Sequence, residues 1–301
     1  MISKEYLLGL IGFPLDHSLS PAIHAAALRA LDLDGEYRLY PVPPLPAGSA
    51  SLEDHLRLFR QGDLVGINVT IPHKQSILPL LDALTPTAQA IGAVNTIYYH
   101  DDLLWGDNTD AAGFMADLKY LGWSFPAAEN PHALILGSGG SARAVSYALL
   151  QNSWSLTVAA RRQDQAQDLV QNIQKFSRLS PNQGDDNQLT AIHLDSRSLI
   201  DLDPSPRLII NTTPLGMSPF QDESPWPEAV PFPSQAAVYD LVYNPPETQL
   251  LSSARKARML VANGLGMLVE QAALSFEIWT GFTPPRDVMR EAANDYRIGA
   301  S

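Results

Sequence analysis

A glycine-rich turn at residues 137–142 has the composition and the setting of a nucleotide-binding loop. It lies between an apolar run at residues 132–137 and an expected helix that extends to about residue 151. Its first glycine permits a tight turn, its second lets backbone N–H groups approach a pyrophosphate, and the small residue at the third position lets helix and strand pack closely. An ordinary glycine turn is the alternative. We expect a dinucleotide to bind at Gly137, Ser138, Gly139, Gly140, Ser141 and Ala142.

Two arginines after the next expected strand indicate which dinucleotide this is. That strand covers residues 155–160 and is followed directly by Arg161 and Arg162. An NAD site places a carboxylate about 20 residues beyond the glycines, to hold the ribose 2′-hydroxyl, and none is present here. Guanidinium groups match phosphate geometry, so a 2′-phosphate is the better partner. The pair predicts NADP(H), and a solvated basic turn is the alternative.

Polar side chains in the first half of the chain stand where strands are expected to give way to helices. Six of them could bind or act on a ligand: Ser18, Ser20, Thr70, Lys74, Asn95 and Asp110. In an open parallel sheet, ligands bind outside the carboxyl ends of the strands. Hydroxyls, an amide, an ammonium and a carboxylate at one edge would suit a small polyhydroxylated acid. Each also has a structural interpretation, such as Ser20 as a helix N-cap and Lys74 as a solvated helix charge.

The elements that would carry these residues alternate between strand and helix over the first hundred positions. We predict strands at 7–12, 37–42 and 65–70, and a hairpin formed by 94–99 and 103–106. Helices are predicted to begin with Ser20 as N-cap, to run to Gly62 behind a capping box of Ser51 and Asp54, and to cover 74–84. This alternation implies a largely parallel sheet with helices on its faces.

The second half of the chain repeats the alternation around the glycine turn. We predict a helix over 110–121, buried strands at 208–211 and 237–241, and a long helix after Gly264 through about residue 279. The polar run at 178–189 predicts a loop, and the proline-rich run at 214–233 predicts irregular structure.

Length and composition set the broad class. A chain of 301 residues with 45% hydrophobic and 17% charged residues predicts about two globular domains. A formal net charge of −12 argues against binding to a nucleic-acid backbone. Without cysteine, thiolate chemistry is excluded. No apolar run is long enough to span a membrane. We expect a cytoplasmic protein with no metal, no membrane partner and no nucleic-acid partner.

Taken in order, the motifs resemble the shikimate dehydrogenase family over essentially the whole chain. The opening segment 12–24 is similar to that family's first motif. Further matches are Asn-Val-Thr-Ile-Pro-His-Lys at 68–74, Gly-Ala-Val-Asn-Thr at 92–96 and Gly-Asp-Asn-Thr-Asp at 106–110, then 137–142, 211–217, 240–243 and 264–272. The resemblance implies NADPH-dependent, reversible reduction of 3-dehydroshikimate to shikimate, in the pathway to chorismate and the aromatic amino acids.

The resemblance also implies roles for individual residues. Lys74 matches the catalytic lysine, which handles the proton at the reacting oxygen together with Asp110. Ser18 and Ser20 match residues that hold the substrate carboxylate. The ring hydroxyls would be bound by Thr70, Asn95, Asp110 and Gln271, and Tyr243 would stand beside substrate and nicotinamide. Gly264 and the backbone of Leu241 fall where the family contacts the nicotinamide half of NADP.

For the fold, the resemblance implies an α/β chain of two domains. Residues 1–109 with 264–301 would form an open α/β substrate domain, and residues 110–263 a Rossmann-like, doubly wound NADP domain. The chain departs from the family at the 2′-phosphate loop, where Ala160-Arg161-Arg162 with Gln165 replaces Asn-Arg-Thr and a further arginine. A quinate/shikimate dehydrogenase that uses NAD and a non-catalytic NADP-sensing module are the alternatives. We expect a monomer or a homodimer.

Overall fold

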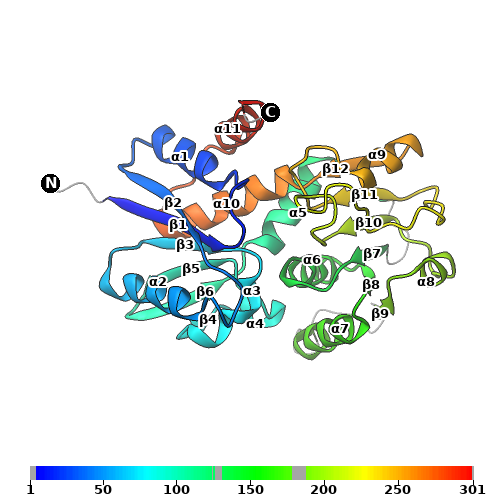
Figure 1. Ribbon diagram of the computed structural model, residues 1–301, viewed down its shortest axis with the longest axis horizontal. Helices are drawn as coiled ribbons and strands as arrows, with labels where there is room; N and C mark the ends of the chain where they lie inside the picture. The colour runs from blue at the N-terminus through cyan, green and yellow to red at the C-terminus, as the bar shows by residue number, and fades with distance from the viewer. Residues whose placement is uncertain (1–4, 124, 126–130, 178–187, 300–301) are drawn as a thin grey trace. The chain divides into compact units, whose positions relative to one another are not determined.

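The computed structural model describes residues 5–123, 125, 131–177 and 188–299, and the chain divides into two compact units (Figure 1). Unit 1 comprises residues 1–116 and 268–301, and unit 2 comprises residues 117–267. The chain passes between the units within α5 (Asp110–Tyr120) and within α10 (Leu265–Thr280). Both helices therefore belong in part to each unit.

Unit 1 is built on a mixed sheet of six strands in the order β2-β1-β3-β5-β6-β4. The strands are β1 (Tyr6–Gly12), β2 (Gly35–Pro41), β3 (Gly66–Val69), β4 (Ala83–Leu84), β5 (Thr96–His100) and β6 (Leu103–Asp107). β1 pairs in parallel with β2 and β3, whereas β5 is antiparallel to both β3 and β6. The carboxyl ends of β1 and β3 consequently lie at the same edge of the sheet.

The helices of unit 1 follow the sequence prediction in part. They are α1 (Ser20–Ala30), α2 (Ser49–Gln61), α3 (His73–Ser76), α4 (Pro86–Ile91) and α11 (Arg286–Gly299), with a 3₁₀ turn at Leu78–Leu80. The predicted capping box of Ser51 and Asp54 is wrong, because α2 already begins at Ser49 with Gly48 as its N-cap. Gly62 ends α2 in the left-handed conformation, at φ +82°, which favours glycine.

The prediction of a continuous helix over 74–84 is also wrong. Pro79 cannot donate a backbone hydrogen bond, and it lies in the 3₁₀ turn that follows the short helix α3. Beyond that turn the chain is tied to β6, since the amides of Asp82 and Thr85 donate to the carbonyls of Leu104 and Gly106 at 3.0 Å each. Tertiary pairing with β6 thus replaces the second half of the expected helix.

Unit 2 is a fully parallel sheet of six strands in the order β12-β11-β10-β7-β8-β9. The strands are β7 (His132–Leu136), β8 (Ser155–Ala160), β9 (Leu189–His193), β10 (Leu208–Asn211), β11 (Ala237–Asp240) and β12 (Leu260–Asn263). The order reverses between β7 and β10, which is the switch point where doubly wound sheets bind nucleotides. The α/β fold class predicted from the sequence is confirmed.

The helices of unit 2 include some that the sequence analysis did not predict. α6 (Gly140–Gln151) was expected, whereas α7 (Gln163–Ser177) and α9 (Gln249–Lys256) were not, and neither was the short α8 (Ser196–Ile200). Most of the expected loop at 178–189 lies outside the described residues. The proline-rich segment 214–233 contains no helix or strand, as predicted.

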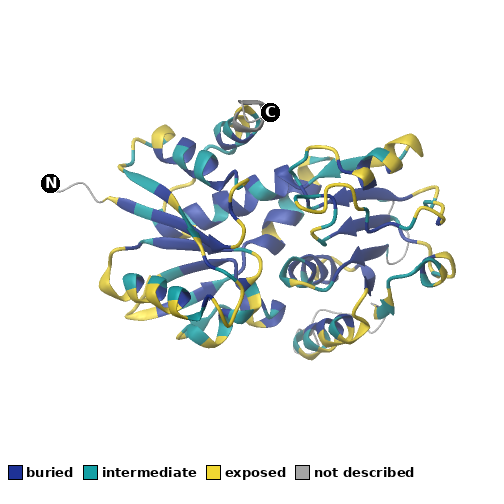
Figure 2. Cartoon of the chain, viewed as in Figure 1, coloured by how far each residue is buried: buried dark blue, intermediate teal, exposed yellow. Residues whose placement is uncertain are grey.

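Each unit has its own apolar core. Ile11, Phe59 and Ile67 belong to a buried cluster of unit 1, and Leu134, Ile209 and Val238 to one of unit 2. Figure 2 shows the central strands of each sheet buried and the outer faces of the helices exposed. Within the described residues, no helix combines the length and apolar character needed to cross a membrane.

Candidate functional site

The strongest candidate for acid–base chemistry is an ion pair in unit 1. Lys74 lies in α3, directly after β3, and Asp110 is the first residue of α5. The Lys74 Nζ donates to Asp110 Oδ2 at 2.6 Å, and the two side chains are only 12% and 5% exposed. Little water reaches this pair, so the local charges are weakly screened and act strongly on any group bound beside them.

Asn95 and Gln271 join this pair to form one polar cluster. The Asn95 amide nitrogen donates to Asp110 Oδ1 at 3.0 Å and to Gln271 Oε1 at 3.1 Å. Asn95 follows α4 and precedes β5, whereas Gln271 comes from α10, near the other end of the chain. Four residues singled out from the sequence therefore meet: Lys74, Asn95, Asp110 and Gln271.

A second layer of buried polar residues supports the cluster, and the sequence analysis did not assign it a role. The side-chain Nδ2 of Asn68 donates to the backbone carbonyl of Asn95 at 3.0 Å and to Ser275 Oγ at 2.9 Å. The Oδ1 of the same side chain accepts from the Tyr37 hydroxyl at 2.9 Å. Ser275 stands one helical turn after Gln271 and donates to the Gln271 carbonyl at 3.0 Å. Because residues four positions apart lie on the same face of a helix, the spacing of Gln271 and Ser275 could have indicated from the sequence that Ser275 lies beside Gln271.

The three remaining candidates of unit 1 lie at the carboxyl ends of β1 and β3. The Thr70 amide donates to the Ile11 carbonyl at 2.8 Å, and Ser20 N donates to Ser18 Oγ at 3.3 Å. Ser20 is not the N-cap of α1: Leu19 holds that position, and no side chain caps the helix. These bonds hold the three residues in the segments that follow β1 and β3.

The glycine loop of unit 2 has the shape that a pyrophosphate requires. Gly137 has φ +112°, a conformation that disfavours other residues, and a Cβ there would lie 2.6 Å from Thr212 Oγ1. Gly139 is the N-cap of α6, has no side chain to cap the first turn, and has open space where its Cβ would be. The helix N-terminus is thus accessible to an anion. The loop at residues 137–142 fits a dinucleotide.

Arg161 and Arg162 are both exposed and immediately follow β8. Among the residues that the structure describes, neither forms an ion pair with a carboxylate. Arg143, on α6 just after the glycine loop, is a further cation that the sequence analysis did not consider. Its Nε is buried and has no hydrogen-bond partner among the described residues. Cationic side chains therefore follow both β7 and β8, the two strands at the glycine loop.

The candidates for the nicotinamide half of a cofactor lie at the ends of β11 and β12. The Leu241 amide donates to the Asn211 carbonyl at 2.9 Å, and the Gly264 amide donates to the Val242 carbonyl at 3.3 Å. A Cβ on Gly264 would lie 2.1 Å from the Leu241 carbonyl oxygen, so only glycine fits. Tyr243 is half-buried in the same loop.

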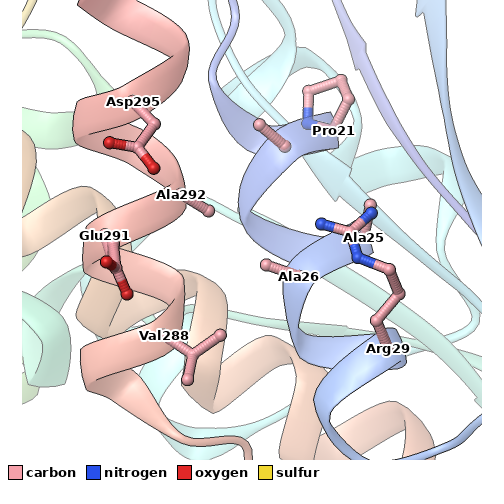
Figure 3. Close-up of a pocket in the computed structure, with 9 residues that line it drawn as sticks. Pro21, Ala25, Ala26, Arg29, Val288, Glu291, Ala292 and Asp295 are labelled. Carbon is pink, nitrogen blue, oxygen red and sulfur yellow. The ribbon is translucent and has the colours of Figure 1, made fainter.

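Two other features lie apart from these residues. A hollow of about 490 Å³ separates α1 from α11, between Ala25 and Arg29 on one side and Glu291 and Asp295 on the other (Figure 3). It is lined by none of the candidate residues. Among the described residues, no group of three or more histidine or acidic side chains is placed to hold a metal ion.

Chemically, the two units offer different capabilities. The cluster of unit 1 can hold a polar ligand through amide and hydroxyl groups and can exchange a proton through Lys74. The glycine loop and arginines of unit 2 can hold a phosphorylated dinucleotide. Together they have the components of a dehydrogenase.

Comparison with known proteins finds two matching family models. One, described as the shikimate dehydrogenase substrate binding domain, matches residues 10–97. The other, described as the shikimate 5'-dehydrogenase C-terminal domain, matches residues 264–293.

Relatives and solved structures match nearly the full length. A shikimate dehydrogenase (NADP⁺) of Salinibacter ruber is 40% identical over 289 residues, which are 95% of this chain and 96% of that protein. A crystal structure of a shikimate dehydrogenase in complex with NADP⁺ has a TM-score of 0.82 at 37% identity, and the match covers 97% of this chain and 96% of that one. The enzyme of Thermus thermophilus, in complex with NADP(H) and shikimate, has a TM-score of 0.79 at 36% identity, over 96% and 99% of the two chains.

Proposed function

The chain belongs to the shikimate dehydrogenase family, and we propose from this premise that it reduces 3-dehydroshikimate to shikimate reversibly with NADPH. The observation that carries the proposal is the buried cluster of Lys74, Asp110, Asn95 and Gln271, because it unites an acid–base pair with ligand-binding amides. The residue roles that follow are part of the proposal.

Lys74 is proposed as the group that handles the proton. Reduction of a ketone places negative charge on the carbonyl oxygen, which must be stabilised and then protonated. The Lys74 ammonium can do both, and Asp110, at 2.6 Å, holds it in place. In the oxidative direction the same lysine receives the proton from the substrate hydroxyl. The low exposure of the pair strengthens the electrostatic contribution.

The other residues of unit 1 are proposed to orient the substrate. Ser18 and Ser20 would bind its carboxylate, and the finding that Leu19, rather than Ser20, is the N-cap of α1 supports this, since the Ser20 side chain is not used to cap that helix. Thr70, Asn95, Asp110 and Gln271 would bind the ring hydroxyls. Tyr243, in unit 2, is proposed to stand beside substrate and nicotinamide.

NADPH, when bound, supplies the hydride. The chain's own part is to hold the cofactor: Gly137, Ser138, Gly139, Gly140, Ser141 and Ala142 at the pyrophosphate, and Leu241 and Gly264 at the nicotinamide half. Arg161 and Arg162 are proposed to bind the 2′-phosphate through charge-assisted hydrogen bonds. We assign substrate binding to residues 1–109 with 264–301 and NADP binding to residues 110–263. A cytoplasmic location and a monomeric or homodimeric state stay predictions.

The test is a substrate comparison at a fixed cofactor. Purified protein is given NADP⁺ with either shikimate or quinate, and NADPH formation is followed by its absorbance. We expect turnover of shikimate with a kcat/KM far above that for quinate. Faster oxidation of quinate would favour the quinate/shikimate alternative, and no turnover of either compound would favour a non-catalytic NADP-binding module.

A further inference from the structure

Asp240, the last residue of β11, is a fully buried carboxylate with three hydrogen-bond donors around it. Its Oδ1 accepts from Asn211 Nδ2 at 2.8 Å and from the Val242 amide at 3.0 Å. Its Oδ2 accepts from the Thr248 hydroxyl at 2.6 Å. Burial raises the pKa of the Asp240 carboxyl to about 6, so it is ionised at pH 8.

The three donors come from three different segments at the carboxyl edge of the sheet. Asn211 ends β10, Val242 lies in the loop after β11, and Thr248 is the N-cap of α9, where its Oγ1 accepts from the Leu251 amide at 3.3 Å. One carboxylate therefore fixes both ends of the loop 241–248. Because that loop contains Tyr243, its geometry depends on Asp240.

The backbone groups proposed to meet the nicotinamide half are attached to the same point. Asn211, which donates to Asp240, accepts from the Leu241 amide through its own carbonyl, at 2.9 Å. Val242, which donates to Asp240 through its amide, accepts from the Gly264 amide at 3.3 Å. The carbonyl of Leu241 is packed against Gly264 so closely that no Cβ fits between them. Displacement of Asp240 would thus move Leu241, Tyr243 and Gly264 together.

We propose that Asp240 is a positioning residue that sets the loop 241–248 and Gly264 for the nicotinamide half of the cofactor. The inference rests on the proposed function, and it concerns one half of the cofactor only. The adenosine half is assigned to the ends of β7 and β8, to the glycine loop and the arginines, which make none of the hydrogen bonds described for Asp240. A defect at Asp240 should therefore weaken binding of the whole dinucleotide and spare binding of its adenosine fragment.

Two variants test this with two ligands. Asp240→Asn keeps the side-chain shape and two acceptor contacts but removes the charge, and Thr248→Val keeps the shape of its side chain but removes the hydroxyl. NADP⁺ and 2′,5′-ADP, which contains only the phosphorylated adenosine, are titrated by calorimetry at pH 8. We expect both variants to bind NADP⁺ about tenfold more weakly than the wild type and 2′,5′-ADP within about twofold of it. Thr248→Ser, which restores the hydroxyl, should regain most of the NADP⁺ affinity.

Ser146→Ala is the matched control for a buried substitution in unit 2. Ser146 is fully buried in α6, its hydroxyl has no hydrogen-bond partner among the described residues, and the variant should bind both ligands as the wild type does. A parallel loss of both ligands in the Asp240 and Thr248 variants would show a merely structural role and overturn the inference. Unchanged NADP⁺ affinity in both variants would also overturn it. Wild-type protein that binds no NADP⁺ would instead refute the proposed function, and the inference with it.

Discussion

At the scale of single residues, the proposed chemistry uses a pair that the sequence indicated and supporting residues to which the sequence assigned no role. Lys74 and Asp110 are 36 positions apart, and motif context singled out both. Asn68, Ser275 and Asp240 act through buried hydrogen bonds to distant segments, as in the contact between Asn68 and Ser275 across 207 positions. Helical spacing can place Ser275 beside Gln271, but the bond from Asn68 depends on tertiary packing between segments far apart in the sequence.

Replacement of Lys74 by alanine tests the proton-transfer role. We expect Lys74→Ala to lower kcat by at least about 10²-fold, the usual contribution of a general acid or base, while the affinity for shikimate changes only a few-fold. Steady-state kinetics with shikimate and NADP⁺ measure the first, and calorimetric titration with shikimate measures the second. A kcat near that of the wild type would remove lysine from the mechanism.

Ser18 and Ser20 test the carboxylate site. Ser→Ala at either position should raise the KM for shikimate about two- to tenfold, as expected for the loss of a single hydrogen bond. Because the Ser20 side chain does not cap α1, Ser20→Ala should leave the melting temperature nearly unchanged. An unchanged KM together with a lower melting temperature would assign these serines a structural role instead.

At the scale of elements, the two sheets were more predictable than the segments between them. The short apolar runs at 132–137 and 208–211 predicted the bounds of β7 and β10 to within one residue. Such runs are informative because buried parallel strands are continuously hydrophobic. The prediction of a helix over 74–84 was wrong because Ala83–Leu84 forms a strand that pairs with β6, and this pairing depends on tertiary contacts. α7 was missed although its apolar residues Ala166, Leu169, Val170 and Ile173 have helical spacing.

The packing of His24 in α1 against Tyr37 in β2 predicts how the stability of the protein depends on pH. The His24 ring is fully buried and stacks on Tyr37 with ring centroids 4.2 Å apart, and burial lowers the pKa of His24 to about 3. The unfolded chain takes up a proton near pH 6.5, whereas the folded chain does not, so stability is lost as the pH falls from about 6.5 toward 3. His24→Phe keeps a ring and removes the titration.

We therefore expect the wild type to lose stability relative to His24→Phe as the pH is lowered. The free energy of unfolding of the variant minus that of the wild type should increase by about 1 to 2 kcal/mol from about pH 7.5 to pH 5. Urea denaturation at each pH measures it. Parallel pH curves for the two proteins would show that His24 does not remain neutral in the folded state.

The loop between β8 and α7 makes a prediction about the cofactor. Replacing both Arg161 and Arg162 by alanine removes two charge-assisted contacts, which should raise the KM for NADP⁺ about 10²-fold or more and leave that for NAD⁺ nearly unchanged. Lys175→Ala, which removes an exposed cation near the other end of α7, is the matched control and should change neither KM. Equal losses for both cofactors would point to damage in the fold.

At the scale of the whole molecule, the chain builds two α/β units and returns to the first after completing the second. The segment after Gly264 carries Gln271 back to unit 1, where it meets Asn95. Composition predicted two globular domains, and the motif order predicted the family. The antiparallel hairpin of β5 and β6 was predicted, but its place in the sheet, between β3 and the edge strand β4, was not, because the local sequence of a hairpin does not fix which strands it pairs with.

The cofactor preference of the wild-type protein tests NADP-dependent oxidation of shikimate most directly. Initial rates of nicotinamide reduction with shikimate are measured over a range of NADP⁺ and of NAD⁺ concentrations, and kcat/KM is compared. Two arginines and no carboxylate directly at the end of β8 predict a preference for NADP⁺ of about 10²-fold or more. Equal use of the two cofactors, or a preference for NAD⁺, would show that Arg161 and Arg162 do not select NADP⁺ in this protein.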